Sequence, residues 1–316
     1  MSPRTRQLLL NLLRIGLSVG LLTYVLWQID WQEFQSTLQN ANPWPYLGAL
    51  ALGLVGVVLR AWRWKVLLDA VNLRVNFRRL VYLYFVGAFY NSFLPTGFGG
   101  DVVRVLEFGP HADRAVVTGT TIVDRLTGFV MLFVLALAAL PFSTQYLPSG
   151  VIWPVALAGI ALLVGTALLF EGKILRTLTS FLPGPLSLSG EGWLARTFDS
   201  ILRGGRAGLW RALGISLLFN LILLTAAVLL TQALRINVSI VALFVFVPIA
   251  TASLLLPSIS GLGVRETMYQ VLFAQVGVGS TQATAFSLAY YSIDLFAGIV
   301  GGLLYLVTSA GNLRQK

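Results

Sequence analysis

The sequence predicts an all-α, polytopic membrane protein, and three observations support this prediction. Hydrophobic residues make up 57% of the 316 residues and charged residues only 11%, whereas soluble chains typically carry about 25% charged residues. Apolar segments close to the roughly 20 residues that span a bilayer recur from residue 8 to residue 308. Basic residues concentrate in some loops and are missing from others. We therefore expect one transmembrane domain over residues 1–316.

Eight hydrophobic segments are expected to form helices: 8–27, 44–64, 80–94, 115–141, 150–170, 210–234, 238–257 and 281–308. The first follows Arg4 and Arg6 and has no small-residue cleavage site after it, so we interpret it as an uncleaved helix. Segments 80–94 and 238–257 differ from the rest, because each runs into a proline and glycines, which break a helix and permit a turn. The helix-break residues are Pro95, Gly97, Gly99, Gly100, Pro257, Gly261 and Gly263.

Loop charge indicates how these segments cross the membrane. Residues 60–79 hold six basic residues against Asp69, and the loop at about 171–209 is also basic, whereas 28–43 holds two acids and no Lys or Arg. Basic loops stay in the cytoplasm, so we expect both basic loops and both termini there. Eight full crossings would place 171–209 outside. If the chain instead forms two re-entrant hairpins, one at each proline/glycine break, the loop 171–209 lies in the cytoplasm as expected. Such hairpins imply a protein-lined or wet cavity.

The two breaks also indicate an internal repeat. Asp124 and Gly128 follow the first break in the pattern D-x-x-x-G, and Asp294 and Gly298 follow the second. With the hairpins in place, repeat one covers about 8–141 and repeat two about 150–308, with opposite orientations in the membrane. Inverted repeats with broken helices are typical of secondary transporters. The G-x-x-x-G pair Gly298/Gly302 predicts a close helix contact.

Charged residues in and next to apolar segments, together with the polar residue Asn91, are the candidate binding and translocation residues. A charge at a helix centre costs about 2.5–3.5 kcal/mol on insertion scales and normally faces a partner or water. Arginine also matches phosphate oxygens in a two-pronged geometry. Purely structural pairing remains open for each of these residues, including self-neutralisation of the acids and arginine after the first break. The candidates are Asn91, Asp101, Arg104, Glu107, Asp124, Arg125, Arg265, Glu266 and Asp294.

Composition argues against several other classes of site. The chain has no cysteine and one histidine, His111, so we expect no disulfide, metal site, cofactor or catalytic triad. It also lacks the G-x-x-x-x-G-K-[ST] phosphate loop, so ATP hydrolysis by this chain is not expected. The net charge of +10 is explained by basic membrane loops, and we expect no nucleic acid partner.

The motifs resemble those of a known family, the lysylphosphatidylglycerol synthase transmembrane region, a flippase-like domain also grouped as an uncharacterised membrane family. The resemblance spans nearly the whole chain. The matching motifs are Arg60-Ala61-Trp62-Arg63-Trp64, Asn91-x3-Pro95-x3-Gly99-Gly100-Asp101-x2-Arg104, Asp124-Arg125-x2-Gly128 and Pro257-x3-Gly261-Leu262-Gly263-x2-Glu266. One departure is Ser-Ile-Ser before Gly261, where the family often has a second proline and glycine.

The resemblance implies a multi-pass protein of a bacterial or archaeal plasma membrane, and it implies lipid translocation in those members that carry lysyl-lipid synthase activity. Synthase members carry a large C-terminal aminoacyl-transfer domain, whereas this sequence ends at Lys316, so lysine transfer is not expected. We expect a flippase for a phospholipid or polyprenyl-linked lipid, not an enzyme, with membrane lipids as partners. The alternatives are a membrane enzyme acting on a lipid phosphate and a non-transporting partner of a separate lipid-modifying enzyme. The sequence leaves the oligomeric state open.

Overall fold

The computed structural model describes residues 20, 23–93, 99–108, 113–144, 147–180, 188, 192–253, 261 and 263–313. The described residues form helices joined by turns, without a strand. The all-α prediction is therefore confirmed. Most of the predicted first segment, 8–27, lies outside the described residues.

Five helices are long and apolar enough to cross a bilayer: α3 (Pro43–Ala70), α6 (Arg114–Ser143), α7 (Ser149–Glu171), α10 (Gly205–Ala233) and α13 (Ser280–Leu313), the last over Ser280–Thr308. Polar caps start several helices. Asn42 accepts a hydrogen bond from the Trp44 amide at the start of α3, and Asp113 accepts one from the Ala115 amide at the start of α6. α3 extends beyond the predicted segment 44–64 to Ala70, so Arg60 and Arg63, which also belong to the basic stretch 60–79, lie well inside a helix.

The two segments predicted to be re-entrant form helical hairpins. The described parts of α4 (Phe77–Phe93) and α11 (Ile240–Ser253) have 17 and 14 residues. α5 (Gly99–Glu107) returns along α4: Arg79, near the start of α4, donates a hydrogen bond of 2.7 Å to the Phe108 carbonyl. α12 (Val264–Ala274) likewise returns along α11, with the Phe246 and Phe273 rings 5.6 Å apart.

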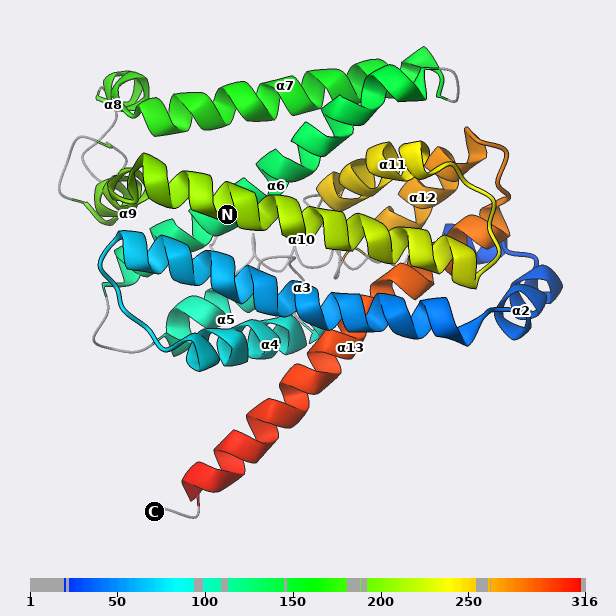
Figure 1. Cartoon of the computed structure of the whole chain (residues 1–316), viewed down its shortest axis with the longest axis horizontal. Helices are drawn as coiled ribbons and strands as arrows, with labels where there is room; N and C mark the ends of the chain where they lie inside the picture. The colour runs from blue at the N-terminus through cyan, green and yellow to red at the C-terminus, as the bar shows by residue number, and fades with distance from the viewer. Residues whose placement is uncertain are drawn as a thin grey trace, which may run out of the picture.

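α3 and α10 pack side by side and antiparallel at the centre of the molecule (Figure 1). Three glycines sit in this seam: Gly48 faces Leu229, Gly56 faces Phe219 and Gly208 faces Ala70. The hairpin α4–α5 contacts α13, and the hairpin α11–α12 contacts α6, so each hairpin packs against the last long helix of the other half. Inverted repeats require this reciprocal pattern. The repeat boundaries themselves stay a prediction.

Three short helices lie outside this arrangement. α2 (Trp31–Gln39) occupies the predicted outer loop and is capped by Asp30. α8 (Lys173–Thr179) and α9 (Trp193–Arg203) occupy the predicted basic loop. α9 is strongly amphipathic, and its apolar face, including Phe198 and Ile201, is buried against α6 and its neighbours rather than left open to lipid.

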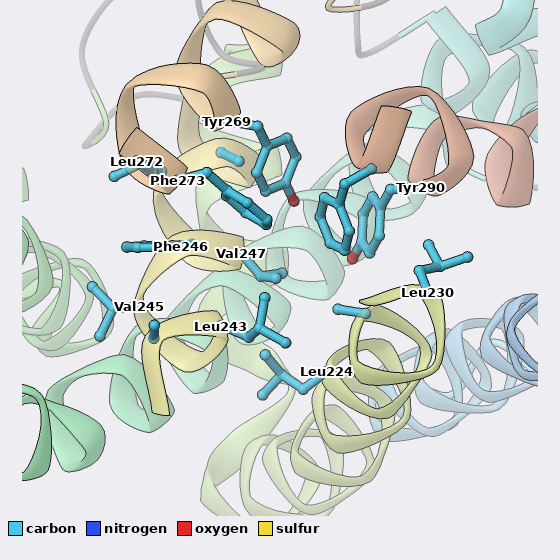
Figure 2. Close-up of a cluster of buried hydrophobic side chains, with 14 of the residues drawn as sticks. Leu224, Leu230, Leu243, Val245, Phe246, Val247, Tyr269, Leu272, Phe273 and Tyr290 are labelled. Atoms are coloured by element: carbon cyan, nitrogen blue, oxygen red, sulfur yellow. The ribbon is translucent and has the colours of Figure 1, made fainter. Parts of the chain in front are cut away.

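The largest hydrophobic cluster connects the second hairpin to α10 and α13. Figure 2 shows Phe246 from α11, Tyr269 and Phe273 from α12, and Tyr290 from α13 converging in its interior. These rings contact edge to face or tilted at centroid distances of 5.6–6.2 Å. The second hairpin is therefore anchored by aromatic packing. α7, in contrast, lies at one edge of the molecule and exposes Trp153 and Leu157 (Figure 1), as expected of a lipid-facing helix.

Candidate functional site

A partly enclosed cavity of about 320 Å³ lies between the two hairpins and the central helices. Gly56 of α3, Phe129 of α6 and Asn220 of α10 line it, and each is close to the middle of its helix. A cavity at the centre of spanning helices lies near the midplane of a bilayer. Its charged lining residues among those described are Arg60, Arg63, Arg104, Arg125, Arg265, Asp101, Asp124 and Asp294.

Asp124 is the centre of a buried charge network. Its side chain accepts a hydrogen bond of 2.6 Å from Arg63 Nε and another from the Tyr84 hydroxyl. Arg104 Nη1 lies 3.8 Å from Asp124 Oδ2. Asp124, Arg63 and Arg104 are 1%, 3% and 3% exposed, and buried charges are tolerated only when they are paired. The network joins α3, α4, α5 and α6.

Asp101 links the first hairpin to α6. It accepts hydrogen bonds from Arg104 on its own helix and from Arg125 on α6. Arg104 also stacks over aromatic rings, with Cζ 3.9 Å from the Tyr84 centroid and 4.9 Å from that of Trp64. As expected from their adjacent positions on a helix, Asp124 and Arg125 pair with other elements and not with each other.

Glycines create the space for this network. A methyl group on Gly128 would lie 2.8 Å from Arg63 Nη1, so the glycine of the first D-x-x-x-G motif makes room for the arginine that its aspartate binds. Gly87 and Gly100 let α4 and α5 approach closely, since a Cβ on Gly100 would lie 2.2 Å from the Gly87 carbonyl oxygen. The Asn91 side chain accepts a hydrogen bond of 2.6 Å from the Gly100 amide, which fixes the start of α5.

The second hairpin holds a smaller and self-contained ion pair. Arg265 Nη2 donates to Glu266 Oε1 at 2.7 Å, and Arg265 Nε donates to Ser287 Oγ at 3.2 Å. The other Glu266 oxygen accepts a hydrogen bond of 2.7 Å from the Gly263 amide, so Glu266 caps α12. Arg265 lies over the Tyr291 ring at 4.5 Å. Arg265 and Glu266 are neighbours on one helix, whereas Arg63 and Asp124 pair between two helices.

Asp294 differs from Asp124 although both belong to the same motif. Its side chain lines the cavity and is exposed, and it makes no hydrogen bond or ion pair within the described part of the chain. Gly298, one turn later, makes room for α4, because a Cβ there would lie 2.8 Å from Ser92 Oγ. The two D-x-x-x-G motifs thus have different roles in the fold.

The cavity brings together most of the residues predicted from the sequence. Asn91, Asp101, Arg104, Asp124, Arg125, Arg265 and Asp294 all line it. Glu266 lies behind Arg265, fully buried, and Glu107 is exposed at the end of α5, away from the lining. Gly99 and Gly100 begin α5, whereas Gly261 and Gly263 precede α12 with φ of 78° and 81°, values that favour glycine. Pro95, Gly97 and Pro257 lie outside the described residues.

Sequence reasoning missed Arg60 and Arg63 as site residues and assigned them to a cytoplasmic loop. Both lie on α3, three residues apart, and line the cavity. Two signals were available: the i, i+3 spacing at the end of an apolar segment, which places both on one helical face, and the motif of residues 60–64 that carries the family resemblance. Tyr84 and Ser216, which also bind the network, are of types that usually bond across membrane helices and gave no distinct signal.

The described residues contain no group of three His, Cys, Asp or Glu side chains that could hold a metal ion. The two carboxylates that the first half contributes to the cavity lining, Asp101 and Asp124, are both paired with arginines. The arrangement is suited to binding a charged group in a desolvated pocket.

Comparison with known proteins gives two matches. The family model described as lysylphosphatidylglycerol synthase TM region matches residues 11–302. A UPF0104 membrane protein of Pyrococcus horikoshii is 23% identical, over 93% of this chain and 96% of its own length. The family match contains both hairpins and every charged residue of the cavity.

Proposed function

The chain belongs to the lysylphosphatidylglycerol synthase transmembrane-region family and is an integral multi-pass membrane protein, and from this premise we propose that it is a lipid flippase. It moves a phospholipid or polyprenyl-linked lipid between leaflets by passing the polar head group through the central cavity, and it does not act as an enzyme. The observation that supports the proposal is the mid-span cavity lined by arginines and aspartates.

A mid-span cavity with charged walls matches what lipid translocation requires. A head group crossing a bilayer loses its hydration, and polar protein groups must replace it. The five arginines and three aspartates that line the cavity supply these groups. The two hairpins pack against opposite halves of the molecule, and a change in that packing would open the cavity to one leaflet and then the other.

Orientation and energy source are part of the same proposal. The face of the molecule that carries the basic loop, with α8, α9 and the start of α10, is the basic face. It lies in the cytoplasm of a prokaryotic cell together with both termini. Since the sequence has no phosphate loop for ATP, movement is downhill or coupled to an ion gradient. Membrane lipids are its partners.

The test is translocation of head-group-intact fluorescent lipids in proteoliposomes that contain the purified protein. Arg104→Ala removes a buried charge that contacts Asp101 and Asp124, and we expect it to reduce the rate at least tenfold. The matched control is Arg206→Ala, which removes an exposed arginine at the start of α10. Equal rates for wild type and Arg104→Ala would refute the proposal.

The same vesicles separate the alternatives. A membrane enzyme would release a new product from a labelled lipid phosphate, detectable by mass spectrometry. A non-transporting partner would co-purify with a synthase or glycosyltransferase and leave lipid asymmetry unchanged. Either outcome, without translocation, would replace the flippase proposal.

A further inference from the structure

Two buried arginine nitrogens on the cavity have no hydrogen-bond partner among the residues that the structure describes. They are Arg60 Nε and Arg104 Nη1. Both residues line the same cavity, and both guanidinium groups lie near the Tyr84 ring, Arg60 at 5.9 Å and Arg104 at 3.9 Å from its centroid. A buried donor without an acceptor destabilises the fold, and more so when it is charged. Two such donors on one cavity favour an anion as its ligand.

The charges around the cavity do not cancel. In the first half, Arg60, Arg63, Arg104 and Arg125 face only Asp101 and Asp124, which leaves an excess of two positive charges among the described lining residues. In the second half, Arg265 is cancelled by Glu266, and Asp294 adds one negative charge. The cavity as a whole is therefore positive by one charge when Asp294 is ionised.

From this arrangement we propose that the cavity selects a head group with a net charge of minus one, a monoanionic phosphodiester, and that Arg60 and Arg104 clamp its phosphate. Within the described part of the chain, the Arg60 guanidinium lies over the Tyr84 and Phe219 rings, and its Nε donor is left for a ligand. Asp294, in the second half, lowers the excess positive charge of the cavity from two to one and so determines the head-group charge that is selected. The inference rests on the proposed flippase function and names its substrate class.

Cavity size agrees with a small head group. The volume of about 320 Å³ is at the lower end of the range for ligand pockets, about 300–1,000 Å³. A phosphodiester with a short polyol fills such a space. Zwitterionic head groups of similar size are discriminated by charge, because their phosphate and ammonium together leave the cavity's excess charge unneutralised.

The test compares translocation rates of lipids that differ in head-group charge, in vesicles containing phosphatidylglycerol, phosphatidylethanolamine and phosphatidic acid with the same fluorescent acyl chain. Wild type is expected to move phosphatidylglycerol about tenfold faster than phosphatidylethanolamine, because the ammonium of phosphatidylethanolamine adds a positive charge to a cavity that already carries one in excess. Rate ratios do not depend on how much of a variant folds.

Two variants shift the selected charge in opposite directions. Arg60→Gln removes one positive charge, and the ratio of phosphatidylglycerol to phosphatidylethanolamine should fall towards one. Asp294→Asn removes the negative charge, and at a pH where phosphatidic acid is dianionic its rate should rise relative to phosphatidylglycerol. Arg206→Gln, at the exposed start of α10, should leave both ratios at wild-type values. Unchanged ratios in Arg60→Gln and Asp294→Asn would overturn the inference.

Free phosphate is distinguished from lipid by loading the same vesicles with radiolabelled inorganic phosphate. Efflux of phosphate in place of lipid movement would overturn the lipid assignment. If wild type moves no lipid, the flippase proposal fails, and mass spectrometry of lipid retained from an equimolar vesicle mixture then tests the inference by itself. Preferential retention of phosphatidylglycerol, lost in Arg60→Gln, would support it, and equal retention of all three lipids would contradict it.

Discussion

Asp124 and Gly128, one helical turn apart on α6, both determine where Arg63 lies. Asp124 accepts the Arg63 Nε hydrogen bond, and Gly128 leaves space for Nη1, which donates to Ser216 on α10 at 3.0 Å. Asn220, also on α10, donates a hydrogen bond of 3.1 Å to the Gly128 carbonyl. One short motif therefore fixes three helices around a buried charge.

Gly128→Ala tests this role. The added methyl group would lie 2.8 Å from Arg63 Nη1 and push the arginine away from its partners, so we expect a loss of stability on the order of 1–3 kcal/mol. Thermal unfolding in detergent measures the change. The control is Gly214→Ala on α10, where the methyl group would meet no atom within 4 Å. Equal melting temperatures for the two variants would contradict the proposed fit.

For single residues, the sequence predicted the buried aspartates better than the arginines that bind them. A charge inside an apolar run, such as Asp124 or Asp294, is conspicuous, because insertion into lipid is costly. Arg63 lies at the edge of such a run, where positive charge also has the ordinary role of holding a loop in the cytoplasm. Sequence alone does not show whether Arg63 is a buried ion-pair partner or a loop residue, because the answer depends on how far α3 continues past the apolar segment.

The seam between α4 and α13 holds the first hairpin in place. Gly298, Gly301 and Gly302 of α13 face α4, and a Cβ on Gly301 would lie 1.9 Å from the Phe85 carbonyl oxygen. Small residues allow such close approach in membrane proteins, where packing drives helix association. The predicted contact at Gly298/Gly302 is confirmed, and Gly301 makes the tightest approach of the three.

Gly301→Ala should separate the two helices. Because the clash is with backbone and not with a flexible side chain, the hairpin must move, and we expect a loss of about 1–3 kcal/mol. The readout is the apparent melting temperature together with the rate of proteolysis. Gly165→Ala on the lipid-facing helix α7, where a Cβ meets nothing within 4 Å, should behave as wild type. Wild-type melting of Gly301→Ala would show that the seam is looser than described.

Helix breaks were the most informative elements in the sequence. A proline followed by glycines ends a helix for reasons local to the chain, so both hairpins could be predicted. Their partners could not, because reciprocal packing of each hairpin on the opposite half depends on contacts between residues up to about 200 positions apart, such as Ser92 and Gly298.

The whole molecule has two faces of different charge. On one, Asp30 donates its amide to Thr281 Oγ1 at 3.1 Å, which joins α2 to the start of α13. On the other, Arg79 binds the Phe108 carbonyl and Arg196 lies 3.7 Å from Asp113. The first hairpin begins and ends on the basic face, and the second hairpin begins and ends on the face that carries α2.

Labelling of single introduced cysteines tests this topology. Because the chain has no native cysteine, only the introduced residue can react with the reagent. In intact cells, a membrane-impermeant maleimide should label Ser36→Cys and Gln275→Cys. Glu107→Cys and Arg206→Cys should react only after permeabilisation. All four positions are exposed. Labelling of Glu107→Cys and Arg206→Cys on opposite sides of the membrane would mean that the first hairpin is not re-entrant as described.

The long-range partners of Arg63 have a consequence for biosynthesis. Asp124 is 61 residues further along the chain and Ser216 is 153 residues further. Since a polypeptide leaves the ribosome from its N-terminus, α3 meets the translocon before either partner has been made. The nascent segment must therefore wait beside the insertion machinery, or at the lipid boundary, until α6 arrives to neutralise its arginine.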